Sequence, residues 1–94
     1  MITYDNDTLH KAILYNGRTS QVLVAVEELS ELQKELLKNC NRNADNLQQI
    51  LEEMADVYIM LKQLMMIYEF DINDLNEVVI EKQERLRGRL NEEM

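Results

Sequence analysis

The chain has 94 residues, with 18 acidic and 10 basic side chains, a net charge of −8, one cysteine and one histidine. A single thiol excludes a disulfide framework and a zinc ribbon, and a single imidazole excludes sites that need two histidines. The acidic balance argues against a nucleic-acid partner, which needs a basic face. The absence of proline argues against turn-rich β folds. We therefore predict one all-α domain over residues 1–94, cytoplasmic and without a membrane span.

The first part of the chain predicts two helices separated by a glycine. Side chains of residues 5–8 supply N-cap chemistry for a helix over 8–16, which Gly17 ends. Thr19 and Ser20 then cap a helix over 20–39. Its apolar residues follow the 3.6-residue period of one helical face, at Val22, Ala25, Val26, Leu29, Leu32 and Leu36.

Two further helices are predicted after a polar stretch at residues 39–43. Asp45 followed by Gln48 has the spacing of a capping box for a helix over 46–70. Asp71 then starts a helix over 72–91, whose apolar stripe contains Leu75, Val79, Leu86 and Leu90. Because short connections between long helices favour antiparallel packing, the expected architecture is a four-helix bundle.

The third predicted helix is apolar on nearly every side. Only Lys62 and Gln63 are polar between Val57 and Tyr68. We expect its core-facing stripe to be Leu47, Ile50, Met54, Tyr58, Leu61 and Met65. The other apolar side chains also need cover, which a chain of this length supplies poorly. The pattern therefore predicts a homodimer or homotetramer, and the alternative is a central helix covered within one chain.

Two segments, one on each of the long central helices, share an acidic pattern. Residues 26–32 and 51–57 both read apolar, Glu, Glu, apolar, small, acid, apolar. Residues three apart share a helical face, which pairs Glu28 with Glu31 and Glu53 with Asp56. Both pairs have the same phase relative to their apolar stripe. If the helices pack antiparallel, the four carboxylates converge at one rim of the bundle.

Four converging carboxylates repel one another unless a cation neutralises them. Oxygen ligands without histidine or cysteine favour Mg²⁺ or Mn²⁺ over zinc or copper. An ion held in this way keeps positions that phosphate oxygens fill, which predicts metal-assisted attack of water on a phosphoanhydride. The alternative is that both pairs are ordinary solvated residues of helix surfaces.

The acidic segments together resemble the signature of the MazG-like all-α nucleoside triphosphate pyrophosphohydrolases, in the pattern Glu27-Glu28-x-x-Glu31, a spacer, and Glu53-x-x-Asp56. Residues 15–17, Gln21 and the basic run after the third helix also resemble that family. The resemblance covers most of the chain. It implies a four-helix, dimeric or tetrameric fold that binds Mg²⁺ and cleaves a nucleoside or deoxynucleoside triphosphate to the monophosphate and pyrophosphate.

The resemblance also implies a role for each residue of this chain that matches the family's motif. The resemblance implies metal ligands at Glu28, Glu31, Glu53 and Asp56. Glu27 matches the remaining motif glutamate, which we assign to orienting or deprotonating water. Glu52 has no corresponding role, and we expect it to be exposed.

Cations for the substrate phosphates are expected on the fourth helix. Lys82 shares the apolar stripe of that helix, and Arg89 lies close to it, with Arg85 as a weaker candidate. The alternative is that these residues are charges near a helix C-terminus, where they favour the helix dipole.

The sequence is also compatible with two other functions. A phosphoribosyl-ATP pyrophosphatase has a similar fold and acidic motif. A non-catalytic helical oligomerisation or adaptor module explains the apolar third helix without using the acids. Stabilisation by Mg²⁺ separates the adaptor from the enzymes, because only a clustered set of carboxylates gains from the ion.

Overall fold

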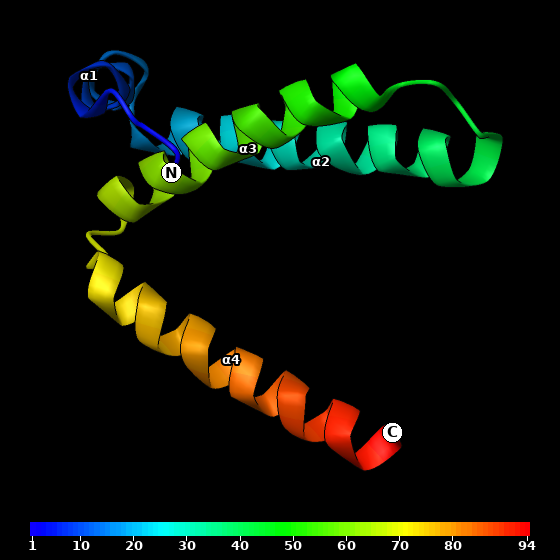
Figure 1. Cartoon of the computed structure of the whole chain (residues 1–94). Coiled ribbons are helices and arrows are strands. Elements are labelled where there is room, and N and C mark those ends of the chain that lie inside the picture. Colours follow the sequence, from blue (N-terminus) through cyan, green and yellow to red (C-terminus); the bar gives the residue numbers. More distant parts are fainter.

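The computed structural model describes all 94 residues and contains four helices and no strands (Figure 1), which confirms the predicted all-α class. None of the helices combines the length and the apolar character needed to cross a membrane. The helices follow one another in the predicted order, as α1 (Asn6–Asn16), α2 (Arg18–Arg42), α3 (Leu47–Ile67) and α4 (Ile72–Glu93).

Aspartates cap the first and last helices. Asp71 caps α4, as predicted, and Asp5 caps α1, which begins at Asn6 rather than at residue 8. The Asp5 carboxylate accepts hydrogen bonds from the Thr8 backbone N–H at 3.2 Å and from the Thr8 hydroxyl at 2.8 Å. These bonds lower the pKa of Asp5. Asp71 accepts from the Asn73 backbone N–H at 2.8 Å at the start of α4. Each cap satisfies a backbone donor that the first helical turn leaves unpaired.

The two inner helix starts differ from the prediction. Gly17, at φ 92°, separates α1 from α2, and α2 begins directly at Arg18 without a side-chain cap from Thr19 or Ser20. The predicted capping box of the third helix is also wrong. The N-cap residue of α3 is Asn46, whose side chain makes no capping hydrogen bond and instead contacts α2.

Helices α2 and α3 form an antiparallel pair, and α1 packs across one end of it (Figure 1). The short connection at residues 43–46 turns the chain back on itself, with Asn43 in the left-handed conformation that ends α2. The buried apolar side chains all come from these three helices and are few, at Leu9, Ala25, Val57, Met60 and Ile67.

The buried face of α3 is not the predicted stripe. Met54, Tyr58 and Leu61 are 41–45% exposed, and Leu47 is 69% exposed. The helix instead buries Val57, Met60, Gln63 and Ile67. Because α3 is apolar on nearly every side, its periodicity did not identify one face. The buried face is the one on which Gln63 accepts a hydrogen bond from Gln21 of α2.

Helix α4 does not fold back onto the other helices. After α3 the chain turns at Glu69, which has a φ of 55°, and α4 then extends away from the pair (Figure 1). Every residue of α4 is exposed. The stripe that was expected to face a core is 41–46% exposed at Leu75, Val79, Leu86 and Leu90. Three helices therefore pack within one chain, rather than the expected four.

Candidate metal centre

The α2/α3 pair brings the two acidic segments together at the middle of the pair. Glu28 comes from α2, and Glu53 and Asp56 come from α3. One carboxylate oxygen from each of these residues lies within 4.8 Å of the others. Glu28 and Glu53 are half-buried, while Asp56 is exposed. We call these three residues the acidic cluster.

The acidic cluster holds its negative charges at an energetic cost. Burial raises the pKa of Glu28, and the nearby charges of Asp56 and Glu53 raise it further. The pKa of Glu53 is also raised, first by burial and then by the charges of Asp56 and Glu31. Loss of water and like charges both disfavour the ionised form, so both effects act in the same direction. A cation bound between these groups would favour their ionised form.

One oxygen of the acidic cluster has no partner in the protein. Glu53 Oε2 is shielded from solvent and accepts no hydrogen bond. Buried polar atoms are nearly always paired, and an unpaired one calls for an explanation. An oxygen-only donor set with one unsatisfied, water-shielded oxygen fits a hard divalent cation such as Mg²⁺.

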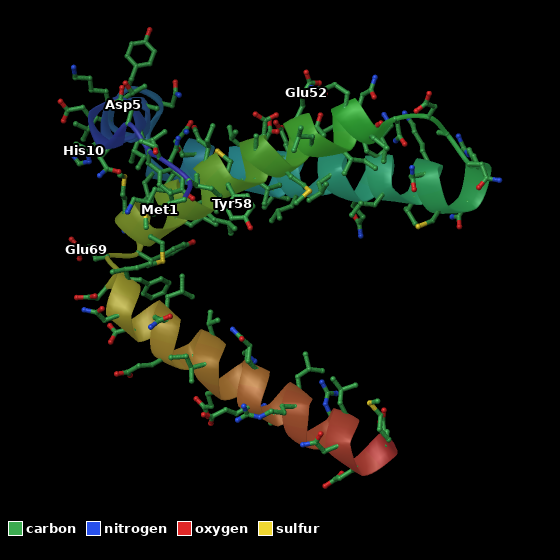
Figure 2. All side chains as sticks on the ribbon, in the orientation of Figure 1. Met1, Asp5, His10, Glu52, Tyr58 and Glu69 are labelled. Atoms are coloured by element: carbon green, nitrogen blue, oxygen red, sulfur yellow. The ribbon has the colours of Figure 1, made fainter.

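The remaining predicted acids lie outside this group of three. Glu31 is exposed, and its carboxylate is not among the three whose oxygens lie within 4.8 Å of one another. Its charge nevertheless raises the pKa of both Glu28 and Glu53. Glu27 is exposed at the preceding position of α2. Glu52 is exposed, as expected, and Figure 2 shows it pointing away from α4.

A buried amide pair lies between the acidic cluster and α1. Gln21 Nε2 donates to Gln63 Oε1 at 2.6 Å, and the two residues are 4% and 3% exposed. Gln21 Oε1 also accepts from Asn16 Nδ2 at 3.0 Å. Because a slip of either helix would leave these buried amides unpaired, the pair fixes the register that aligns Glu28 with Glu53.

A second polar contact lies on the other side of the acidic cluster. Asn46 Nδ2 donates to the Glu35 backbone oxygen at 2.9 Å and to Glu35 Oε1 at 3.0 Å. Glu35 also accepts from Lys38 at 3.2 Å. The hydrogen bonds from Asn46 and Lys38 lower the pKa of Glu35. The sequence did not predict this contact, because Asn46 is one of several asparagines in this part of the chain and nothing near it indicates that it is the buried one.

The predicted phosphate-binding cations do not meet the acidic cluster within one chain. Lys82, Arg85 and Arg89 lie on α4, which extends away from the α2/α3 pair (Figure 1), and all three are exposed. Arg85 makes an exposed ion pair with Glu81 at 3.7 Å. A single copy of the chain therefore separates its acidic residues from the cations of its last helix.

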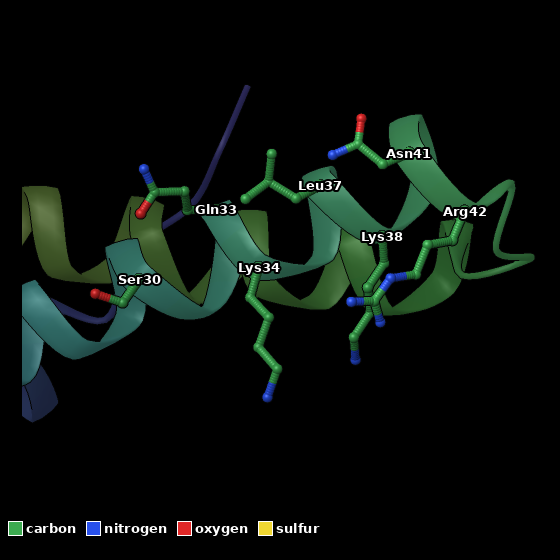
Figure 3. Close-up of a pocket in the computed structure, with 7 residues that line it drawn as sticks. All are labelled: Ser30, Gln33, Lys34, Leu37, Lys38, Asn41 and Arg42. Atoms are coloured by element: carbon green, nitrogen blue, oxygen red, sulfur yellow. The ribbon is translucent and has the colours of Figure 1, made fainter.

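Other cations lie further along α2. Figure 3 shows Lys34, Lys38 and Arg42 extending to one side of the helix, around a shallow hollow of about 390 Å³. Only Arg42 lies in the last turn of α2, where positive charge favours the helix dipole, and Lys38 makes an ion pair with Glu35 at 3.2 Å. These interactions account for Arg42 and Lys38 without a ligand.

Comparisons of the chain with family models, with curated protein sequences and with solved structures each give no match.

Proposed function

We propose that the chain is a Mg²⁺-dependent nucleotide pyrophosphohydrolase. Its substrate is a nucleoside or deoxynucleoside triphosphate, and its products are the monophosphate and pyrophosphate. The observation that carries the proposal is the acidic cluster, whose three carboxylates lie within 4.8 Å and include a shielded, unpartnered oxygen. The resemblance of both acidic segments to the MazG-like signature supports the same activity.

In this proposal each group of residues has a separate role in the reaction. Glu28, Glu53 and Asp56 hold the cation, and Glu31 completes its environment from the exposed edge of α2. A cation held there would polarise a phosphoryl oxygen and offset the charge of the triphosphate. Glu27 orients a water molecule and accepts its proton as the water oxygen attacks the α-phosphorus. The bond from that phosphorus to the bridging oxygen breaks, and pyrophosphate leaves. Lys82, Arg85 and Arg89 are the proposed ligands of the phosphate oxygens, and because α4 extends away from the acidic cluster of its own chain, they would reach the phosphates only in the self-associated form.

The test is pyrophosphate release from a panel of nucleoside and deoxynucleoside triphosphates and phosphoribosyl-ATP. Wild type is expected to release pyrophosphate with Mg²⁺, and Mn²⁺ to substitute. Glu53→Gln keeps the shape of the side chain and is expected to lose at least about 100-fold in rate, since loss of groups that only support metal ligands already costs 10–100-fold. Glu52→Gln, on the exposed face, is the matched control and keeps the rate. A wild type as inert as Glu53→Gln with both metals refutes the proposal.

A second candidate is a non-catalytic oligomerisation module. The observation that favours it is the exposure of large apolar side chains on α3 and α4, including Tyr58 at 42%, Leu61 at 45% and Leu86 at 46%. Both candidates involve self-association into a homodimer or homotetramer. They differ in the role of the acids, because only the enzyme requires Mg²⁺ to bind at Glu53.

A further inference from the structure

Residues 1–4, which precede α1, lie against α3. Figure 1 shows this segment crossing from α3 to the start of α1. Its residues Ile2, Thr3 and Tyr4 line a hollow of about 400 Å³. The other side of the hollow is formed by five residues of α3, which are Leu51, Met54, Ala55, Tyr58 and Ile59. We call residues 1–4 the N-terminal strap.

The N-terminal strap is held to α3 without hydrogen bonds. None of the backbone or side-chain hydrogen bonds of the chain involves residues 1–4. The ammonium group of Lys62 lies 5.7 Å from the centre of the Tyr4 ring, and a single contact of this kind contributes modestly. The strap is therefore held mainly by Ile2, which is half-exposed, and by Tyr4, which is half-buried. Its release costs these contacts and leaves no hydrogen bond unpaired.

Tyr4 also lies in the angle between α3 and α4. It lines a second hollow of about 460 Å³, together with Tyr58 and Leu61 of α3 and with Ile72 and Leu75 of α4. Tyr4 and Tyr58 are the residues that line both hollows. The side chain of Tyr4 therefore divides one apolar surface of α3 into two parts.

The strap covers this surface only in part. Leu51 remains 61% exposed, and Met54 and Tyr58 remain 41% and 42% exposed. Together with Leu47 and Leu61, these residues recur at alternating spacings of four and three, which is the spacing along which a second helix packs. We call the five residues the α3 stripe. A helix packed along the α3 stripe would bury side chains that the strap leaves in water.

The strap and a second helix cannot cover the α3 stripe together. The axes of packed helices lie about 8–10 Å apart, and at that distance the side chains of one helix fill the grooves of the other. No space then remains for the backbone of residues 2–4, which shares a hollow with Leu51, Met54 and Tyr58. A helix can therefore pack along the α3 stripe only after the strap has left.

The helix that fits the α3 stripe is α3 of a second copy of the chain. With a net charge of −8, copies of the chain repel one another over most of their surface. The α3 stripe contains no charged residue. A contact of α3 with α3 about a two-fold axis therefore brings no like charges together, and it covers the stripe in both copies.

We infer that the N-terminal strap limits self-association of the chain. In the single chain the strap occupies part of the α3 stripe, and a second copy binds there only when both straps have been released. The strap thus sets the protein concentration at which self-association begins. The inference rests on the self-association that the proposed function includes, and not on the chemistry of the acids.

The variant Ile2→Ser/Tyr4→Ser weakens the strap without changing α3. Ile2 and Tyr4 together bury about as much apolar surface as one fully buried side chain, so the dissociation constant of the self-associated form is expected to fall by at least about tenfold for each strap that is released. Sedimentation equilibrium measures this constant. An unchanged or larger dissociation constant overturns the inference, because a strap that lies outside the interface or forms part of it would give these results.

The control is Leu14→Ser/Tyr15→Ser. This variant removes similar side chains from positions of α1 that are 70% and 91% exposed and that line neither hollow. Its dissociation constant is expected to equal that of wild type. An equal gain in self-association by the control and the strap variant also overturns the inference, because the effect would then not be specific to the strap.

A locked strap tests the same inference in the opposite direction. In a Cys40→Ser background, Thr3→Cys/Ala55→Cys places two thiols on the wall of one hollow. A short bismaleimide reagent with a reducible linker is used to join them within one chain, and the product with the mass of one chain is isolated. We expect the linked chain to self-associate at least about tenfold more weakly than the same chain after reduction of the linker. Equal self-association before and after reduction overturns the inference.

These experiments measure mass and not rate, so their outcome is independent of the proposed reaction. If self-association depends on the strap as expected but wild type releases no pyrophosphate, only the proposed function fails. If wild type releases pyrophosphate but its self-association does not depend on Ile2 and Tyr4, only the inference about the strap fails.

Discussion

Substitution of Gln63 by leucine tests whether the buried amide pair holds α2 and α3 in register. The change removes the oxygen that accepts the 2.6 Å hydrogen bond from Gln21 and leaves a buried amide donor without a partner. An unpartnered buried donor costs about 1–3 kcal/mol. At about 4–8 °C per kcal/mol for a chain of this size, the melting temperature is expected to fall by roughly 4–24 °C.

The double variant Gln21→Leu/Gln63→Leu makes the test specific. Replacing both partners of a buried hydrogen bond by apolar groups of similar shape is nearly neutral. We therefore expect the double variant to be more stable than Gln63→Leu alone. Only Asn16, which is exposed, then loses a partner. The surface change Gln49→Leu is the control, and its effect is expected to stay within about 0.5 kcal/mol.

The assay is urea and thermal unfolding followed by circular dichroism, at one protein concentration because self-association makes stability depend on it. With the single variant Gln21→Leu added, wild type, the two single variants and the double variant form a double-mutant cycle, and a coupling of at least about 0.5 kcal/mol between Gln21 and Gln63 is expected. A double variant that loses the sum of the two single losses would show that the amides act independently, and it would refute their role in the register.

Three further predictions concern the acidic cluster and its neighbour. Mg²⁺ at a hundred times its dissociation constant is expected to stabilise wild type and Glu52→Gln by about 2.7 kcal/mol in thermal unfolding; an equal response of Glu53→Gln contradicts the assignment. Because the raised pKa values of Glu28 and Glu53 mean that the folded protein binds protons more tightly than the unfolded chain, the urea midpoint measured in EDTA is expected to rise as the pH falls from neutral towards these values. The lowered pKa of Glu35 stabilises the folded protein at neutral pH, and this stabilisation is lost only as the pH falls through that pKa. A urea midpoint that falls steadily from neutral pH downwards would show that the clustered charges of Glu28 and Glu53 do not destabilise the folded protein. Asn46→Ala is expected to raise the pKa of Glu35 towards its ordinary range in an NMR titration, and an unchanged pKa would show that Asn46 is not its main partner.

The features that the sequence predicted well depend on neighbouring residues. Asp5 and Asp71 cap their helices because an N-cap needs only a carboxylate and the backbone N–H groups that follow it. The approach of Glu28 to Glu53 and Asp56 also has a local basis. A spacing of three on each helix, in the same phase, needs only an antiparallel pair to bring the groups together.

The features that it did not predict depend on contacts between distant segments. Gln21 and Gln63 are 42 positions apart, and nothing near either residue indicates that they are buried against each other. Apolar side chains around the whole of α3 left its buried face undecided, so Met54 and Tyr58 were assigned to the core although they are exposed. Similarly, the stripe of α4 indicates a helix that needs cover, but the stripe does not identify the chain that supplies it.

The most direct test of the central claim, that the acidic cluster binds a hard divalent cation, is a titration with Mn²⁺ in which the free ion is measured by electron paramagnetic resonance. We expect saturable binding by wild type and by Glu52→Gln, competed by Mg²⁺, and at least about tenfold weaker binding by Glu53→Gln. Binding that is absent in wild type, or weakened equally by the changes at Glu52 and Glu53, would contradict the account.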